Sequence, residues 1–61
     1  MDALIGREAI VLVEIPTHGL GRVKIDGDNW QAESDGEAVA VGNRVKVLGY
    51  DSIVLKVKPL K

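Results

Sequence analysis

Apolar and polar residues alternate along most of this chain, and no stretch keeps a helical period. The alternation is clearest in 21–26, 30–34, 44–50 and 53–60. A period of two is the pattern of a β-strand that turns one face toward a core. These four segments are therefore predicted to be strands. Their predicted inward-facing residues are Val23, Ile25, Trp30, Ala32, Ser34, Val45, Val47, Ile53, Leu55 and Val57.

The segment 7–15 differs, because its apolar residues occupy both alternating faces from Ala9 to Val13. It is also rich in β-branched residues, which favour strands. A strand that is apolar on both sides is typical of one covered on both sides. We therefore expect a fifth strand here, the first in the chain, buried on both faces and ended by Pro16.

Turn residues separate these strands. Glycine and asparagine, which tolerate left-handed conformations, are frequent in the connecting segments. The predicted turns are PTHGLG at 16–21, GDN at 27–29, DGEAVAVGN at 35–43 with its apolar pair Val39 and Val41, and DS at 51–52. Gly49 indicates a bulge or bend near the end of its strand, and Pro59 stops the last strand. Five short strands so connected predict an all-β domain over residues 1–61, a small closed or nearly closed barrel.

The composition limits how such a barrel can be stabilised. The chain has 61 residues, one histidine and no cysteine, which excludes disulfides, thiolate metal sites and multi-histidine sites. A domain of this size buries only about 60% of its unfolded surface. We therefore expect stability to come from a dense aliphatic core or from a longer protein of which this chain is a piece. No run approaches the roughly 18 apolar residues of a membrane span, and nothing reads as a signal peptide.

The charge balance argues against nucleic acid as a partner. Eight Lys and Arg residues face nine Asp and Glu residues, whereas a nucleic-acid binder needs a basic excess to neutralise phosphates. One Trp, one Tyr and no Phe also offer little surface on which bases could stack. Nucleic-acid binding is therefore not expected.

The sequence also lacks a recognisable catalytic constellation. His18 is the only imidazole, and it lies in a turn without a neighbouring Ser or Cys nucleophile. The acidic residues around the second turn lack the spacing of a calcium loop, so we interpret them as a solvated rim; they are Asp26, Asp28, Glu33, Asp35 and Glu37. No helix follows GLGRVK, which argues against a phosphate loop. Biotinyl and lipoyl carrier domains present a lysine at the tip of a hairpin. Lys24 is instead predicted to lie within a strand, which argues against a carrier domain. We predict no catalytic residue, no metal site and no cofactor.

Basic residues alternate with core positions on three strands: Arg22, Lys24, Arg44, Lys46, Lys56 and Lys58. If the last two strands pair, the last four of these residues share one outer face. They are either ordinary solvent-facing positions or a docking patch for anionic lipid headgroups or an acidic partner. Trp30 has two possible roles as well: it packs at the core or rim of the barrel, or it anchors a partner.

Two stretches, GRVKIDGDNWQAES and GEAVAVGNRVKVLGYDSIVLKVKPL, together with the leading LIGREAIVL, resemble the C-terminal soluble domain of NfeD-like membrane proteins. Gly21, Val23, Ile25, Gly27, Trp30, Ala32 and Gly42 match the pattern of that family, and most of them look structural. The resemblance implies a five-stranded OB-like barrel carried by transmembrane helices that this chain does not contain. Longer relatives also carry a serine protease domain, which is not present here.

The resemblance further implies a non-catalytic interaction or scaffolding role beside partners of the stomatin, prohibitin and flotillin class. The expected location is at a membrane, as the soluble part of a longer protein, with the cytoplasmic side favoured. The candidate interaction surface is Trp30, Arg44, Lys46, Lys56 and Lys58. The alternative is an OB-type binder of single-stranded nucleic acid or oligosaccharide, whose ligands contact the face of strands 2 and 3.

Overall fold

Five strands and one short 3-10 turn make up the regular structure of the protein. The computed structural model describes residues 2–60. The elements are η1 (Asp2–Leu4), β1 (Glu8–Val13), β2 (Gly21–Ile25), β3 (Asp28–Ser34), β4 (Arg44–Asp51) and β5 (Val54–Pro59). The all-β prediction is therefore confirmed, and each predicted strand corresponds to an observed one.

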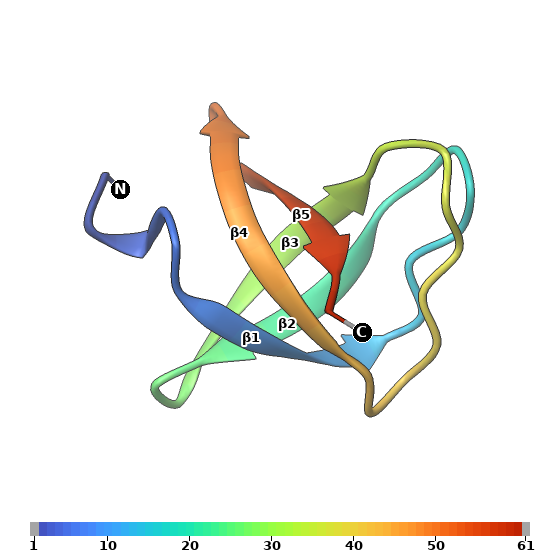
Figure 1. The fold of residues 1–61 in the computed structure, drawn as a ribbon, viewed down its shortest axis with the longest axis horizontal. Helices are drawn as coiled ribbons and strands as arrows, with labels where there is room; N and C mark the ends of the chain where they lie inside the picture. The colour runs from blue at the N-terminus through green and yellow to red at the C-terminus, as the bar shows by residue number, and fades with distance from the viewer. Residues whose placement is uncertain (1, 61) are drawn as a thin grey trace.

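The strands close into a barrel in the order β1-β2-β3-β5-β4 (Figure 1). The first three strands follow one another as an antiparallel meander. The connection 35–43 then returns the chain to the other side of β1, so that β4 pairs antiparallel with β1. β5 fills the remaining gap, antiparallel to β4 and parallel to β3. Closure leaves each strand paired on both sides, which removes the exposed edges that would invite further strand pairing.

The core is aliphatic and comes from the inward side of every strand and from two loop residues, Ile15 and Val39. Its members within residues 2–60 are Ala9, Val11, Ile15, Val23, Ile25, Ala32, Val39, Val45, Val47, Leu55 and Val57. The alternation read from the sequence correctly predicted seven of these, namely Val23, Ile25, Ala32, Val45, Val47, Leu55 and Val57. Burial of this apolar area from water is the main term that holds so small a fold together.

The two ends of the barrel are closed differently. At one end, Ile15 and Val39 exchange two backbone hydrogen bonds of 2.9 Å, and both side chains are buried. This bridge holds the long loops 14–20 and 35–43 side by side (Figure 1). At the end where η1 and the β2–β3 turn lie, Leu4 and Trp30 are partly buried and pack against the core. Trp30 therefore occupies the rim of the barrel.

The β2–β3 turn is one residue tighter than the sequence analysis predicted. It consists of Asp26 and Gly27, whose φ angles are 50° and 85°, and β3 already begins at Asp28. Positive φ at both central residues is the mark of a type I′ turn, whose twist matches that of the flanking strands.

Replacing Gly27 with alanine should lower the free energy of unfolding by about 1 kcal/mol, because a Cβ is strained at positive φ. No other atom crowds the position, so the cost comes from the backbone conformation alone. Urea denaturation measures the loss. The control is Asp28→Ala at the adjacent exposed strand position; an equal loss there would contradict the assignment to the turn.

One expectation about the last connection was wrong. Ile53 does not face the core: it lies in the turn before β5 and is 65% exposed. The pairs Tyr50–Leu55 and Asp51–Val54 leave only Ser52 and Ile53 to connect the strands. Val41 is likewise exposed in its turn, and only Val39 of that apolar pair reaches the core. The bulge predicted at Gly49 is confirmed by a register shift between Val47 and Gly49.

The prediction that β1 is buried on both faces was also wrong. Ala9 and Val11 are buried, but the alternate residues Ile10 and Leu12 and the terminal Val13 are exposed. A five-stranded barrel has a single core inside it, and no second layer covers the outside of β1 among residues 2–60.

Candidate functional site

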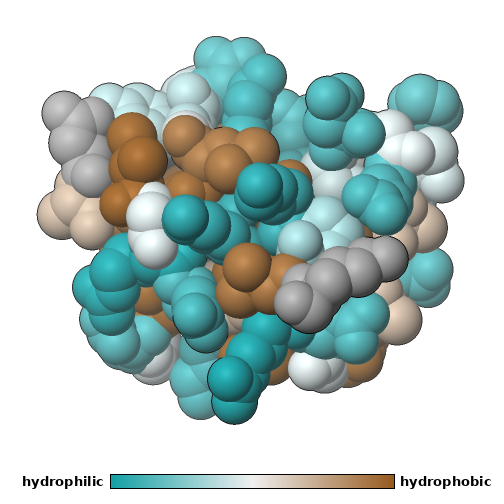
Figure 2. Space-filling view, viewed as in Figure 1, coloured by the Kyte–Doolittle hydropathy of each residue, from teal (hydrophilic) through white to brown (hydrophobic). Residues whose placement is uncertain are grey.

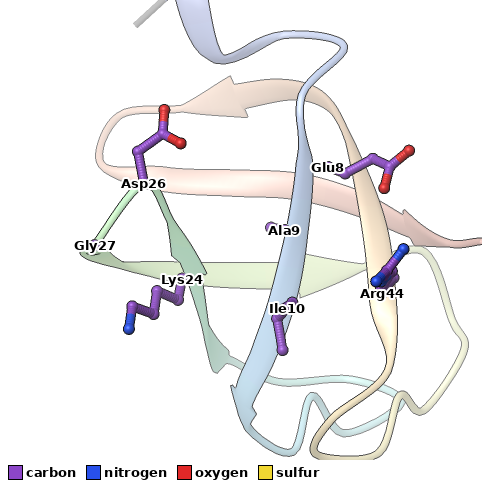
Figure 3. Close-up of a pocket in the computed structure, with 7 residues that line it drawn as sticks. All are labelled: Glu8, Ala9, Ile10, Lys24, Asp26, Gly27 and Arg44. Carbon is purple, nitrogen blue, oxygen red and sulfur yellow. The ribbon is translucent and has the colours of Figure 1, made fainter.

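The outer side of β1 carries an exposed isoleucine between two basic side chains. Ile10 is 46% exposed and lies opposite Lys24 on β2 and opposite Arg44 on β4. Figure 3 shows Ile10 projecting from the outside of β1 with Lys24 and Arg44 on its two sides, whereas Ala9 points behind the strand. The row arises because the outward positions of neighbouring strands lie next to one another in an antiparallel sheet.

Leu12 extends this apolar row along β1. It is 38% exposed and falls at a register shift, where Val11 pairs with Val23 but Val13 pairs with Arg22. We call the surface made by Glu8, Ile10, Leu12, Lys24 and Arg44 the β1 face. A surface hollow overlaps it, lined by Glu8, Ala9, Ile10, Lys24, Asp26, Gly27 and Arg44 (Figure 3).

The charge around Ile10 is mostly positive. Asp26, the acidic residue at the edge of the hollow, forms an ion pair with Arg7. Glu8 lies opposite Lys46 on β4. Lys24 and Arg44 form no ion pair within 4.0 Å with a residue in the described part of the chain. The β1 face thus presents aliphatic carbon flanked by two cations that are available to an incoming carboxylate.

The basic residues predicted as an interaction surface are only partly brought together. Lys46 and Lys58 lie directly opposite each other on β4 and β5, as expected if these strands pair. Lys56 sits opposite Gly49 beyond the bulge and approaches Glu33 on β3, with 3.8 Å between Nζ and Oε2. Arg44, at the start of β4, borders the β1 face instead.

Trp30 does not share the outer face of these basic residues. It follows the inward alternation of β3 with Ala32 and packs against the core at the barrel rim. The residue is only partly buried, so it remains partly accessible to solvent.

A second exposed aliphatic area lies at the bulge of β4. Leu48 is half exposed there, and the backbone N–H of Gly6 donates to the Val47 carbonyl at 2.8 Å. Ile5, also exposed, precedes Gly6. In the space-filling view, hydrophobic surface lies beside the N-terminal turn and over part of β4, with hydrophilic side chains around it (Figure 2). This area continues the outer surface of β4 beyond Lys46.

His18 lies in the exposed turn after Pro16, at an open hollow that also includes Glu33 and Asp35. Neither carboxylate forms an ion pair with His18 within 4.0 Å. Of the predicted acidic rim, Asp26 is paired with Arg7 and Glu33 with Lys56. Within residues 2–60, no group of three or more His, Cys, Asp and Glu side chains is placed to hold a metal ion.

The sequence analysis missed Ile10 and Leu12 as surface residues. The signal was present, since the segment is apolar on both faces, but it was interpreted as burial on both sides. Position 10 becomes distinctive only once the barrel places Lys24 and Arg44 on either side of it.

These observations define a class of protein: a small closed β-barrel of the OB type whose outer surface combines exposed aliphatic and basic side chains. The chain belongs to the family of NfeD-like C-terminal, partner-binding domains, whose sequence model matches residues 1–59. The resemblance read from the sequence is therefore confirmed. No helix among residues 2–60 is long and apolar enough to cross a membrane.

The solved structures similar to the protein include three domains from other organisms. The C-terminal domain of a stomatin operon partner protein from Pyrococcus horikoshii has a TM-score of 0.90 at 26% identity, covering 98% of this chain and 92% of that one. The soluble domain of a Corynebacterium glutamicum membrane protein implicated in regulation of membrane protease activity has a TM-score of 0.85 at 30% identity, with coverages of 93% and 92%. The soluble domain of the NfeD protein YuaF from Bacillus subtilis has a TM-score of 0.86 at 33% identity, with coverages of 95% and 75%. A search of curated proteins finds no match.

Proposed function

We propose that this domain is a non-catalytic interaction module that binds a membrane protein of the stomatin, prohibitin or flotillin class. The observation that carries the proposal is membership, over residues 1–59, in a family of partner-binding domains. The similar domain from Pyrococcus horikoshii belongs to a stomatin operon partner protein, which supports this class of partner. The Corynebacterium relative is the soluble domain of a membrane protein, which supports a location at a membrane as part of a longer protein. The cytoplasmic side is part of this proposal and follows only from the family resemblance.

The outside of β4 and β5 is the candidate contact surface under this proposal. Lys46 and Lys58 place two like charges directly opposite each other, an arrangement that an acidic partner would stabilise. Arg44 and Lys56 extend the basic surface at its two ends, whereas Trp30, partly buried against the core, lies apart from it. Leu48 adds apolar area on the same strand.

Proton–nitrogen NMR of the labelled domain tests the proposal by titration with the soluble part of a stomatin-type protein. We expect shifts that cluster on one outer face of the barrel. Single-stranded DNA, run in parallel, should produce none. DNA-induced shifts that fade as salt rises would overturn the proposal in favour of an OB-type nucleic-acid binder. If no stomatin, prohibitin or flotillin protein tested shifted any resonance of the domain, the partner class would be rejected.

The contact surface is tested by the double variant Lys46→Glu/Lys58→Glu. Reversal of two charges facing an acidic partner should weaken binding about tenfold, mainly through slower association at low salt. The matched control, Lys46→Arg/Lys58→Arg, keeps both charges and should bind as the parent does. Equal affinity of the glutamate and arginine variants would show that this pair of lysines lies outside the interface.

A further inference from the structure

The outward positions of β1 break the pattern of the neighbouring strands. The outward residues of β2 are Arg22 and Lys24, and the part of β4 that pairs with β1 turns Arg44 and Lys46 outward; Leu48 follows only at the bulge. On β1 the corresponding row is Glu8, Ile10 and Leu12. Sheets with one face in water normally place polar residues on that face. Two aliphatic residues on the outer side of β1, Ile10 in its middle and Leu12 near its end, therefore mark a face suited to being covered.

We propose that the β1 face is the docking site for a partner segment that presents aliphatic side chains flanked by carboxylates. The proposal rests on the proposed function, because the occupant is taken to be a protein, and it specifies the chemistry of that partner. Ile10 and Leu12 provide the apolar contact. Lys24 and Arg44, on either side of Ile10, provide the charges that carboxylates pair with.

The closed barrel determines how such a segment can bind. β1 is already hydrogen-bonded to β2 on one side and to β4 on the other. Its backbone therefore offers no free edge to which a partner strand could be added. The contact must be made by side chains. Residues two apart on a strand are separated by about 7 Å, so the partner needs two aliphatic side chains at a similar spacing.

Charge distinguishes this occupant from a second copy of the chain. Two copies joined through the same face around a two-fold axis at Ile10 would oppose the cations Lys24 and Arg44 to the same two cations of the other copy. Like charges at an interface oppose association. The negative groups nearby are Glu8, which lies opposite Lys46, and Asp26, which is paired with Arg7. They are too few to neutralise the face of another copy.

The test uses three probes in NMR titrations of the full chain. One is the soluble part of a stomatin-type protein. Another is a short synthetic peptide, Glu-Ser-Leu-Ser-Leu-Ser-Glu, whose leucines and glutamates fall on one face of an extended chain; lysine-for-glutamate and serine-for-leucine versions are the controls. The third is vesicles of phosphatidylglycerol and phosphatidylcholine. We expect the leucine–glutamate peptide to shift resonances of the β1 face, and both control peptides to bind at least about tenfold more weakly.

Two variants and a matched control locate the site. Ile10→Thr keeps a β-branched residue on the strand but removes apolar surface, and should weaken binding several-fold. Ile53→Thr makes the same change at an exposed isoleucine in the β4–β5 turn and should have no effect. Lys24→Glu/Arg44→Glu should reverse the preference, so that the lysine peptide binds more tightly than the glutamate peptide. Thermal unfolding of each variant separates loss of binding from loss of fold.

The outcomes separate this proposal from the proposed function. Partner binding that survives Ile10→Thr and Lys24→Glu/Arg44→Glu but is lost in Lys46→Glu/Lys58→Glu would overturn the β1 face and leave the proposed function standing. Peptide binding at the β1 face without binding of any stomatin-type protein would support the docking chemistry and reject that partner class. Shifts of the β1 face with anionic vesicles but not with the peptide would overturn the proposal in favour of a lipid surface.

Discussion

Replacing Leu55 with alanine is expected to remove a large share of the protein's stability. The side chain has no exposed surface, and it belongs to the core cluster at the centre of the barrel. Leu55 lies between Ala32 on β3 and Tyr50 on β4, so its loss opens a cavity between two strand pairs. A buried leucine-to-alanine change costs about 2–5 kcal/mol. A domain of this length is stable by only about 3–9 kcal/mol.

Urea denaturation followed by the fluorescence of Trp30, which packs against the core, measures this loss. The matched control is Leu48→Ala, because Leu48 is 50% exposed at the bulge. Its cost should stay within about 0.5 kcal/mol, as is usual for surface changes. Similar losses in the two variants would contradict the placement of Leu55 inside the barrel and Leu48 outside it.

The sequence was sufficient to predict the inward side of four strands. Alternation in β2 and β4 directly predicts which valines are buried, because the side-chain period of a strand is two whatever sheet it joins. Val23, Val45 and Val47 are all buried as expected. The number of strands also followed from the sequence, since glycine-rich turns separate them.

The sequence was not sufficient to predict what covers the outside of β1. An apolar residue such as Ile10 fits equally well beneath a second layer and on the surface of a single barrel. The choice depends on how many layers the whole chain can build, which no local window records. Here the chain builds one barrel, and Ile10 is left outside.

Turn positions were the least predictable feature, for a similar reason. Ile53 has high β propensity and continues the alternation of Leu55 and Val57, so the pattern places it in the strand. Pairing of Asp51 with Val54 requires a two-residue connection, and this tertiary constraint overrides the preference of Ile53. Ser52 takes a positive φ of 60° to complete the turn.

The candidate site depends on topology more than on any motif. Lys24 and Arg44 belong to strands that are distant in the sequence, and only the barrel order places both beside Ile10. Alternation could predict that the two cations face outward, but not that they flank the same residue. The same limit explains why Lys56 turned out to lie next to Glu33: the parallel pairing of β3 with β5 was not visible in the sequence.

Replacing Gly21 with alanine is expected to destabilise the barrel by about 3 kcal/mol, at the upper end of the usual cost of overpacking. A Cβ at this position would lie 2.5 Å from the Val13 carbonyl oxygen, 2.6 Å from the Glu14 carbonyl oxygen and 2.7 Å from Cγ1 of Ile15. Two of these atoms belong to the backbone, and the Ile15 backbone is hydrogen-bonded to Val39. The segment after β1 therefore cannot easily move away to make room for the Cβ.

Calorimetry or urea denaturation of Gly21→Ala measures this cost, and amide NMR spectra should show the largest shifts where the chain leaves β1, around Val13 and Ile15. Gly49→Ala is the matched control, because a Cβ there meets no atom within 4 Å and the residue has no positive φ. It should be neutral or stabilise the protein by up to about 1 kcal/mol, since alanine lowers the entropy of the unfolded chain. If Gly21→Ala were as stable as the parent, β2 would have to start further from the end of β1 than the structure places it. The glycine would then be needed for the turn and not for the close approach of the backbone to Val13 and Glu14.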